Sequence, residues 1–177
     1  MDQTSQRRSL RSVFSDLPLT ALDFVPPVMI TGVTSDSRHV RKGYAFFAIK
    51  GESSDGFKYI PSAVANGARV ILSDRPKPDG LTIPYVRLQG DLHFALAYLA
   101  ASFERFPARK LRMIGVTGTD GKTTTSMLIH HLLTQSGIRA GMISTVNALI
   151  GDQELDTGFH VTTPDSPDIQ AYLAQMV

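Results

Sequence analysis

The chain contains neither cysteine nor a long apolar run. The absence of cysteine from its 177 residues excludes disulfide bonds and zinc sites built on thiolates, and it agrees with a reducing compartment. No apolar stretch approaches the roughly 20 residues that a membrane-spanning helix needs. The basic pair Arg7 and Arg8 is not followed by the apolar segment of a secretory signal. These absences predict a cytoplasmic protein that does not bind membranes.

Neither sign of charge dominates the chain. Its 18 Lys and Arg and 16 Asp and Glu leave a formal net charge of +2, and the basic residues are scattered apart from those at 7–8 and 38–42. This balance gives no electrostatic reason to expect nucleic acid as a partner. With 42% hydrophobic and 19% charged residues, the composition is that of a globular protein with one core or two small ones.

One segment has a distinctive chemistry. Residues 112–125 read Arg-Met-Ile-Gly-Val-Thr-Gly-Thr-Asp-Gly-Lys-Thr-Thr-Thr, which predicts a buried strand, a glycine-rich turn and the start of a helix. This order leaves several backbone N–H groups directed at one point, where an anion binds well. Gly118 and Gly121 can adopt positive φ. Lys122 adds a positive charge, and the hydroxyl of Thr123 is placed to reach a Mg²⁺ ion on the outer phosphates.

The glycine-rich turn departs slightly from the general phosphate-loop pattern. Gly115 stands one place early, and Val116 occupies the position of the first glycine. The alternative, a polar turn with a surface lysine, does not explain why strand, loop, Lys-Thr pair and helix occur together. The predicted nucleotide-binding residues are Gly118, Thr119, Asp120, Gly121, Lys122, Thr123 and Thr124. Among them, Lys122 and Thr123 are the candidate catalytic residues, and Thr123 is the candidate metal ligand.

The part of the chain before this turn alternates short strands with helices. The predicted strands are short apolar runs bounded by turn residues, at 28–33, 44–49, 69–72 and 85–88. The predicted helices have apolar residues at helical spacing, at 10–17, 59–66 and 92–103. Strands that alternate with helices favour an α/β fold with a parallel sheet.

The part after Pro107 is predicted to be a second domain, so the domains span 1–107 and 108–177. The predicted elements are a strand at 112–116, a helix from 122 to 137, a strand at 141–144, a hairpin at 146–157 and a helix from 168 to 177. We expect the first two strands to pair in a mainly parallel sheet. Because a parallel sheet needs cover on both faces, we expect this domain to be truncated and the chain to be the first part of a longer protein.

Two polar loops follow predicted strands of the first domain. Residues 34–38 read Thr-Ser-Asp-Ser-Arg, and residues 50–56 read Lys-Gly-Glu-Ser-Ser-Asp-Gly. Ser and Asp side chains often bond the nearby backbone in turns. At the carboxyl ends of strands in an open α/β sheet, such side chains also bind ligands. The residues alone leave both interpretations open.

Three stretches together resemble the Mur ligases of peptidoglycan synthesis. The first comprises residues 34–38 with Gly43, Phe46, Phe47, Gly51, Asp55 and Gly56, the second is residues 115–125, and the third is the run 162–165, Thr-Thr-Pro-Asp. The resemblance extends from about residue 30 to residue 177 in the order of the family. It is greatest to the branch that adds the third amino acid of the peptide.

The resemblance implies a UDP-MurNAc-binding first domain and an ATP-binding second domain. The implied substrate-binding residues are Ser35, Ser37, Glu52, Ser53, Ser54, Thr162 and Thr163. The implied reaction uses ATP and Mg²⁺ to convert the carboxylate of UDP-MurNAc-L-Ala-D-Glu into an acyl phosphate, which the amine of a diamino acid then attacks. We expect the chain to be a monomer that binds these ligands without catalysing the reaction.

Several alternatives stay open. The family branch that adds D-Ala-D-Ala also resembles residues 36–38, although Thr119 and residues 162–165 favour the tripeptide branch. A non-catalytic UDP-sugar-binding module fits because the amino-acid site of the family lies beyond Val177, and a general ATPase or kinase would not need the sugar. Asp120 stands where the family usually has asparagine. Its charge near phosphates predicts weaker nucleotide affinity.

Overall fold

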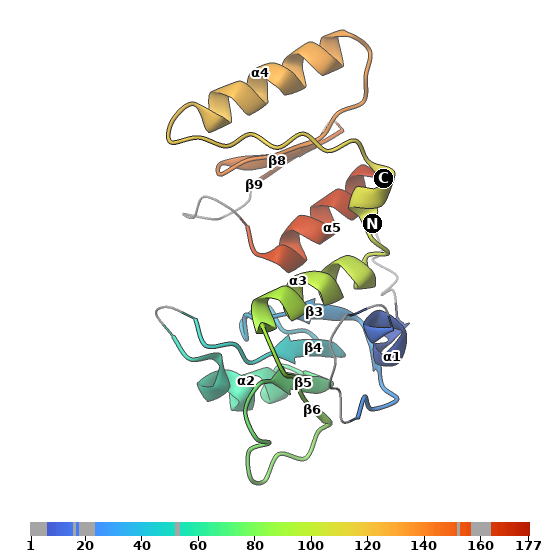
Figure 1. Cartoon of the computed structure of the whole chain (residues 1–177), viewed down its shortest axis with the longest axis vertical. Coiled ribbons are helices and arrows are strands. Elements are labelled where there is room, and N and C mark those ends of the chain that lie inside the picture. Colours follow the sequence, from blue (N-terminus) through green and yellow to red (C-terminus); the bar gives the residue numbers. More distant parts are fainter. Residues whose placement is uncertain (1–6, 16, 18–23, 52–53, 152, 157–163) are drawn as a thin grey trace. The chain divides into compact units, whose positions relative to one another are not determined.

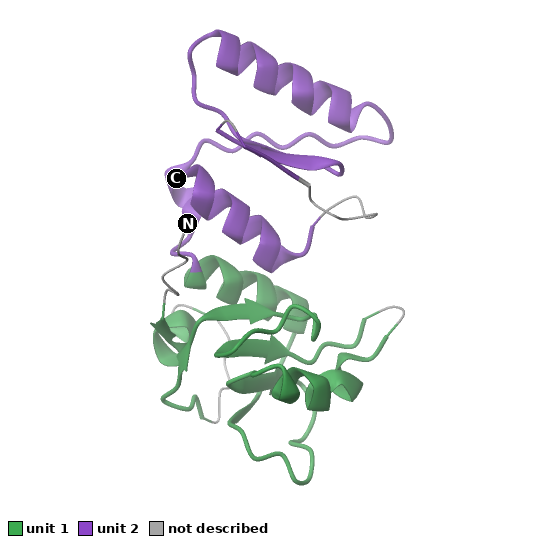
Figure 2. Cartoon of the chain, turned by 180° about the vertical axis from the view of Figure 1, so that it is seen from behind, with its two compact units in different colours: residues 1–103 green, residues 104–177 purple. Residues whose placement is uncertain are grey.

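The computed structural model of the chain describes residues 7–15, 17, 24–51, 54–151, 153–156 and 164–177. The chain forms two compact units, residues 1–103 and 104–177 (Figure 2). The division therefore follows Phe103, close to Pro107. No helix within the described ranges is long and apolar enough to cross a membrane.

A four-stranded parallel sheet forms the centre of the first unit (Figure 1). Its strands, in spatial order, are β3 (Gly32–Thr34), β4 (Tyr44–Phe47), β5 (Val70–Ser73) and β6 (Tyr85–Arg87). Every neighbouring pair is parallel. The α/β fold with a parallel sheet is thus confirmed. Since all four strands run the same way, their carboxyl ends lie at one edge of the sheet.

Helices cover both faces of this sheet (Figure 1). The elements on one face are α1 (Leu10–Phe14) and α3 (Leu92–Phe103), whereas η1 (Gly56–Tyr59) and α2 (Ile60–Ala65) lie on the other. Neighbouring residues of β4 serve different faces, because Phe47 packs in the cluster with α1 and α3, and Phe46 packs in the cluster with α2. Burial on both faces explains why these strands are continuous apolar runs.

Two short strands and a half-buried arginine complete the first unit. Strand β1 (Arg8–Ser9) pairs antiparallel with β2 (Met29–Ile30). The Arg8 guanidinium donates to the carbonyl oxygens of Ser102 and Phe103, the latter at 3.0 Å. Both carbonyls lie in the last turn of α3, where backbone acceptors can be reached by groups outside the helix. Arg8 therefore caps α3 and ties it to the amino-terminal strand.

The second unit combines helices with an antiparallel sheet. Its elements are η2 (Pro107–Lys110), α4 (Lys122–Gln135), β7 (Met142–Ile143), β8 (Asn147–Ile150), β9 (Gln153–Asp156) and α5 (Ser166–Met176). The strand order is β7-β8-β9, and both pairings are antiparallel. The predicted hairpin is therefore present, and the carboxyl-terminal helix begins two residues before the predicted start at 168.

The predicted strand at 112–116 is wrong, and so is its parallel pairing with residues 141–144. Residues 112–116 belong to no strand, and β7 pairs with β8 instead. A strand exists only where a neighbouring strand accepts and donates its backbone hydrogen bonds, and the described residues supply none here. Met113 and Ile114 are accordingly 57% and 62% exposed. An apolar run in the sequence does not show whether a partner strand is present.

Replacing Phe46 tests the packing of the first unit. Phe46 is fully buried, so Phe46→Ala should lower the free energy of unfolding by about 3–5 kcal/mol. The matched control is Phe24→Ala, because Phe24 is 60% exposed and its loss should change stability by less than about 0.5 kcal/mol. Urea denaturation followed by circular dichroism measures both. Equal losses for the two variants would contradict the core described above.

Candidate functional site

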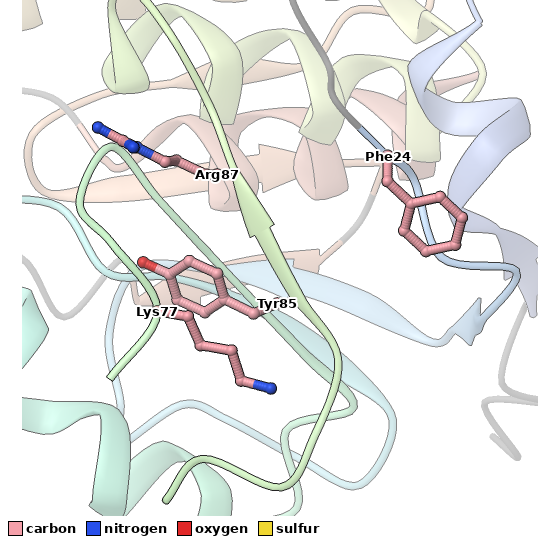
Figure 3. A pocket seen from close by; sticks show the side chains of 4 residues that line it. All are labelled: Phe24, Lys77, Tyr85 and Arg87. Carbon is pink, nitrogen blue, oxygen red and sulfur yellow. The ribbon is translucent and has the colours of Figure 1, made fainter. Parts of the chain in front are cut away.

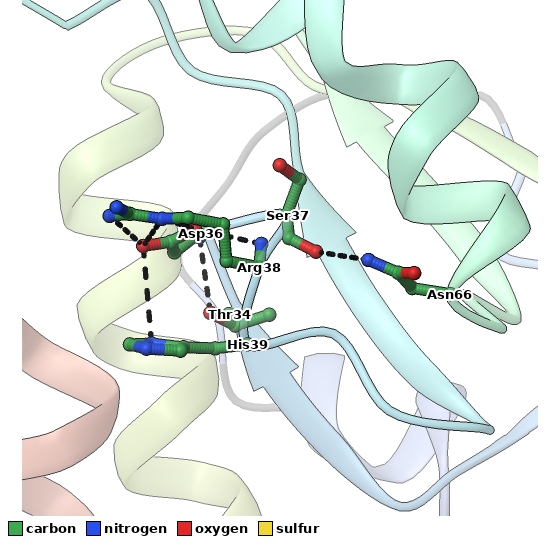
Figure 4. A network of polar contacts seen from close by, with 6 residues as sticks. All are labelled: Thr34, Asp36, Ser37, Arg38, His39 and Asn66. Atoms are coloured by element: carbon green, nitrogen blue, oxygen red, sulfur yellow. Dashed lines mark hydrogen bonds and ion pairs between the residues drawn. The ribbon is translucent and has the colours of Figure 1, made fainter.

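The turn after β3 is built around the Asp36 side chain (Figure 4). Asp36 Oδ1 accepts a hydrogen bond from the backbone N–H of Arg38 at 2.8 Å. The backbone N–H of Asp36 donates to Thr34 Oγ1 at 3.1 Å. Asn66, at the end of α2, donates from its amide to the carbonyl oxygen of Ser37 at 2.8 Å. These bonds fix the backbone of residues 34–38 at the carboxyl end of the strand.

An ion pair reinforces this turn. Arg38 Nη2 lies 2.6 Å from Asp36 Oδ2, and Arg38 Nε lies 3.0 Å from both carboxylate oxygens. The hydrogen bond from the Arg38 side chain is the largest cause that holds the pKa of Asp36 below its ordinary value, against the opposing effect of burial. His39 Nδ1 lies 4.0 Å from the same carboxylate. Asp36 is therefore committed to the turn as an anion.

Two of the predicted substrate-binding serines, Ser35 and Ser37, lie in this turn. Ser35 and Ser37 are half-buried. Neither hydroxyl has a hydrogen-bond partner among the residues that the structure describes, whereas Asp36 supplies the bonds that form the turn. The two open interpretations of this segment therefore apply to different residues. Asp36 has the structural role, and the serine hydroxyls are free to meet a ligand.

The loop after β4 closes on itself. Lys50 and Asp55 form an antiparallel bridge, and the N–H of Gly51 donates to the carbonyl of Ser54 at 2.8 Å. At the end of the loop, the N–H of Gly56 donates to the carbonyl of Ile49 at 2.8 Å. A Cβ at position 56 would lie 2.5 Å from that carbonyl oxygen. Only glycine therefore fits where the loop rejoins the sheet.

The predicted substrate residues of this loop are only partly described. Ser54 is exposed. Glu52 and Ser53 lie outside the described residues, as do Thr162 and Thr163 of the second unit. Since β3 and β4 are neighbouring parallel strands, the turn at 34–38 and the loop at 50–56 share one edge of the sheet. This edge is where open α/β sheets bind ligands.

Two charged side chains hold this loop, in a role that the sequence analysis did not predict. Asp55 Oδ1 accepts from the N–H of Phe57 at 3.1 Å and caps η1, and Asp55 Oδ2 lies 2.9 Å from Arg75 Nη1. The hydrogen bond from Arg75 is the main cause that lowers the pKa of Asp55. An Asp-Gly pair before a helix is a capping signal that the sequence does contain. No local sequence pattern predicts the contact with Arg75, which lies 20 residues after Asp55.

A cavity of about 260 Å³ lies beside β6, lined by Phe24, Lys77, Tyr85 and Arg87 (Figure 3). Strand β6 is the opposite edge strand from β3. None of these four lining residues is a predicted substrate residue.

The glycine-rich turn of the second unit leads directly into α4. Gly118 and Gly121 adopt φ values of 153° and 76°, which favour glycine. Gly121 is the N-cap of α4, and its carbonyl accepts the first helical bond from Thr125 at 2.9 Å. No side chain caps the helix. The amides of its first turn are therefore available to an anion, as the sequence predicted.

The Lys122 ammonium lies against this turn. Its Nζ donates to the carbonyl oxygens of Gly118 and Thr119 at 2.7 and 3.1 Å. The hydroxyl of Thr123 has no partner within the described ranges, and Asp120 is exposed. Lysine, free hydroxyl and uncapped amides are thus gathered in seven residues. This set can neutralise and orient a polyphosphate.

Comparison with known proteins identifies both units. Residues 29–103 match the family described as "Mur ligase family, catalytic domain", and residues 116–177 match the "Mur ligase middle domain". A UDP-N-acetylmuramyl-tripeptide synthetase of Roseiflexus sp. (strain RS-1) is 41% identical over 155 residues. That alignment covers 86% of this chain but 30% of the relative. The chain thus spans about a third of the length of the curated relatives it matches.

Two solved structures resemble the chain. A UDP-N-acetylmuramoyl-L-alanyl-D-glutamate–2,6-diaminopimelate ligase superimposes with a TM-score of 0.70 at 26% identity, over 97% of this chain and 34% of that protein. The MurF ligase of Thermotoga maritima, solved in complex with ADP, gives a TM-score of 0.50 at 27% identity, over 80% and 28% of the two chains. With both of its units matched, this chain belongs to the Mur ligase family.

Proposed function

We propose that the chain binds the sugar nucleotide and the ATP of a ligase that adds a diamino acid to UDP-MurNAc-L-Ala-D-Glu. The observation that carries the proposal is the turn at 118–123, where Lys122 and the uncapped first turn of α4 offer a cation and free amides together. The tripeptide-synthetase and diaminopimelate-ligase names of the relatives support the substrate. We infer that the chain alone is a cytoplasmic monomer that binds without turnover.

The residues of the second unit suit Mg²⁺-ATP. When bound, the nucleotide supplies the phosphoryl group that activates the carboxylate. The N–H groups of residues 118–124 bind phosphate oxygens, Lys122 neutralises their charge, and Thr123 offers its hydroxyl to the metal. Among the described residues, no group of three or more His, Asp or Glu side chains is arranged to hold a metal ion. Of the described residues, we propose that Thr123 contributes a hydroxyl ligand to the metal.

The residues of the first unit suit the uridine diphosphate. The free hydroxyls of Ser35 and Ser37 can bond uracil or pyrophosphate oxygens without burial of an unpaired charge. Ser54 lies on the neighbouring loop, and we propose that Glu52 and Ser53 act with it. We further propose that Thr162 and Thr163 meet the sugar-peptide portion from the second unit.

The D-Ala-D-Ala-adding branch is the second candidate, favoured by the structural likeness to the MurF ligase. Calorimetry separates the candidates, because the proposed substrate ends in D-Glu and the alternative substrate carries the longer tripeptide. We expect this chain to bind UDP-MurNAc-L-Ala-D-Glu at least as tightly as the tripeptide form. Tighter binding of UDP-MurNAc-tripeptide would favour the alternative.

Replacing Lys122 tests the nucleotide site. Lys122→Ala should weaken ATP binding by about 10- to 100-fold, since a hydrogen-bonded charge is lost. Lys110→Ala is the matched control, because it removes an exposed lysine of the same unit that lies outside the turn. Calorimetric titration with Mg²⁺-ATP measures both variants. Unchanged ATP affinity in Lys122→Ala, with a folded circular dichroism spectrum, would refute the site.

Replacing Asp120 tests the charge of the turn. Asp120→Asn removes an exposed carboxylate from a turn that binds phosphate, so ATP affinity should rise by about two- to fivefold at low salt. The gain should shrink as ionic strength rises, because the repulsion is screened. Titrations at two salt concentrations measure this. Weaker binding by the variant would instead show that the carboxylate assists the metal.

Acid titration tests the Asp36–Arg38 turn. Asp36→Asn keeps an oxygen acceptor for the Arg38 N–H but removes the charge. The pKa of Asp36 is lowered in the folded protein from its ordinary value of 3.8. The ion pair therefore stabilises the folded protein at pH values above 3.8. This contribution to stability is lost as the pH falls through the lower pKa of the folded state. Thermal denaturation from about pH 7 to about pH 3 should therefore show the wild type and variant converging. A constant difference would contradict the assignment.

A further inference from the structure

An arginine after β5 holds the loop after β4. Arg75 Nη1 donates to Asp55 Oδ2 at 2.9 Å, and the Arg75 guanidinium carbon lies 5.1 Å from the centroid of the Phe57 ring. Asp55 and Phe57 flank Gly56, the buried glycine at which the loop rejoins the sheet. The guanidinium therefore contacts the residue on each side of Gly56, by an ion pair with Asp55 and a cation–π contact with Phe57.

The backbone of Arg75 is held in turn by the next strand. The Tyr85 hydroxyl donates to the carbonyl oxygen of Arg75 at 2.7 Å. Burial is the largest cause that raises the pKa of Tyr85, so the phenol stays a donor. Arg87 Nε donates to the carbonyl of Asp74 at 3.2 Å. Two side chains of β6 thus fix the segment from which Arg75 reaches the loop.

The Asp55 carboxylate links this arrangement to the proposed ligand loop. Its Oδ1 caps η1 through the N–H of Phe57, which leaves Oδ2 for Arg75. The backbone of Asp55 pairs with Lys50, and Ser54 accepts from Gly51 within the same loop. Motion of Asp55 would therefore move Ser54. A loop that is held before the ligand arrives loses less conformational entropy on binding.

We propose that Arg75 is a positioning residue for the sugar nucleotide, which acts through Asp55 to hold Ser54 and the base of its loop in the binding arrangement. This inference rests on the proposed function. Arg75 works without touching the ligand. Its role is to join the segment after β5 to the loop after β4, the neighbouring strand.

Two variants of the full chain separate charge pairing from capping. Arg75→Gln removes the guanidinium, and Asp55→Asn keeps an oxygen for the Phe57 N–H while it removes the partner charge. Each should weaken binding of UDP-MurNAc-L-Ala-D-Glu by about three- to fivefold, as expected for a partly exposed ion pair. The double variant should lose no more than either single variant. Calorimetric titration measures all four proteins.

The controls distinguish positioning from general destabilisation. Arg109→Gln removes an arginine that lies 4.0 Å from the ring centroid of Phe106 in the second unit, and it should leave sugar-nucleotide affinity unchanged. ATP affinity should be unchanged in Arg75→Gln. Arg75→Lys should recover part of the lost affinity, because it keeps the charge but not the planar stacking group.

The outcomes separate this inference from the proposed function. If the wild type binds no sugar nucleotide, the proposed function fails and takes the inference with it. If the wild type binds and Arg75→Gln binds equally well, the positioning role is overturned while the proposed function stands. Losses that add in the double variant would also overturn it, because Arg75 and Asp55 would then act independently.

Discussion

Parallel pairing of four short strands is the constraint on which the first unit depends. The register pairs Thr34 with Phe46, Phe47 with Leu72, and Ser73 with Arg87. Each strand therefore ends close to its neighbour's end, and the segments that follow the strands meet at one edge. Segments far apart in sequence therefore become neighbours at this end of the sheet. This pairing explains why the turn at 34–38, the loop at 50–56 and Arg75 lie at the same end of the sheet.

The polar residues of this edge divide their work. Aspartates hold the backbone, since Asp36 closes the first turn and Asp55 caps η1 and pairs with Arg75. The hydroxyls of Ser35 and Ser37, by contrast, have no hydrogen-bond partner among the described residues. A carboxylate that is already paired can stay charged near the surface at little cost, whereas a hydroxyl adapts as donor or acceptor to an incoming group. This division gives a rigid frame with adaptable contact points.

Features written in local sequence were the ones that could be predicted. The strands of the first unit are short apolar runs because both faces are buried, and the glycine-rich turn is defined by Gly118, Gly121 and Lys122 within a few residues. The strand at 112–116 was predicted wrongly because a strand also requires a partner. Arg75 escaped notice for a related reason: its contacts with Asp55 and Phe57 are tertiary, and no spacing rule connects residues so far apart.

The closure of the loop after β4 has a consequence for how such proteins diversify. Its two stems are joined by the Lys50–Asp55 bridge, and its exit is fixed by a glycine that no other residue can replace without a steric clash. The described stems of the loop are therefore joined by backbone bonds, which do not depend on side-chain identity. Because such bonds tolerate many side chains, the exposed position of Ser54 can change in evolution to contact another chemical group while the scaffold keeps its stability.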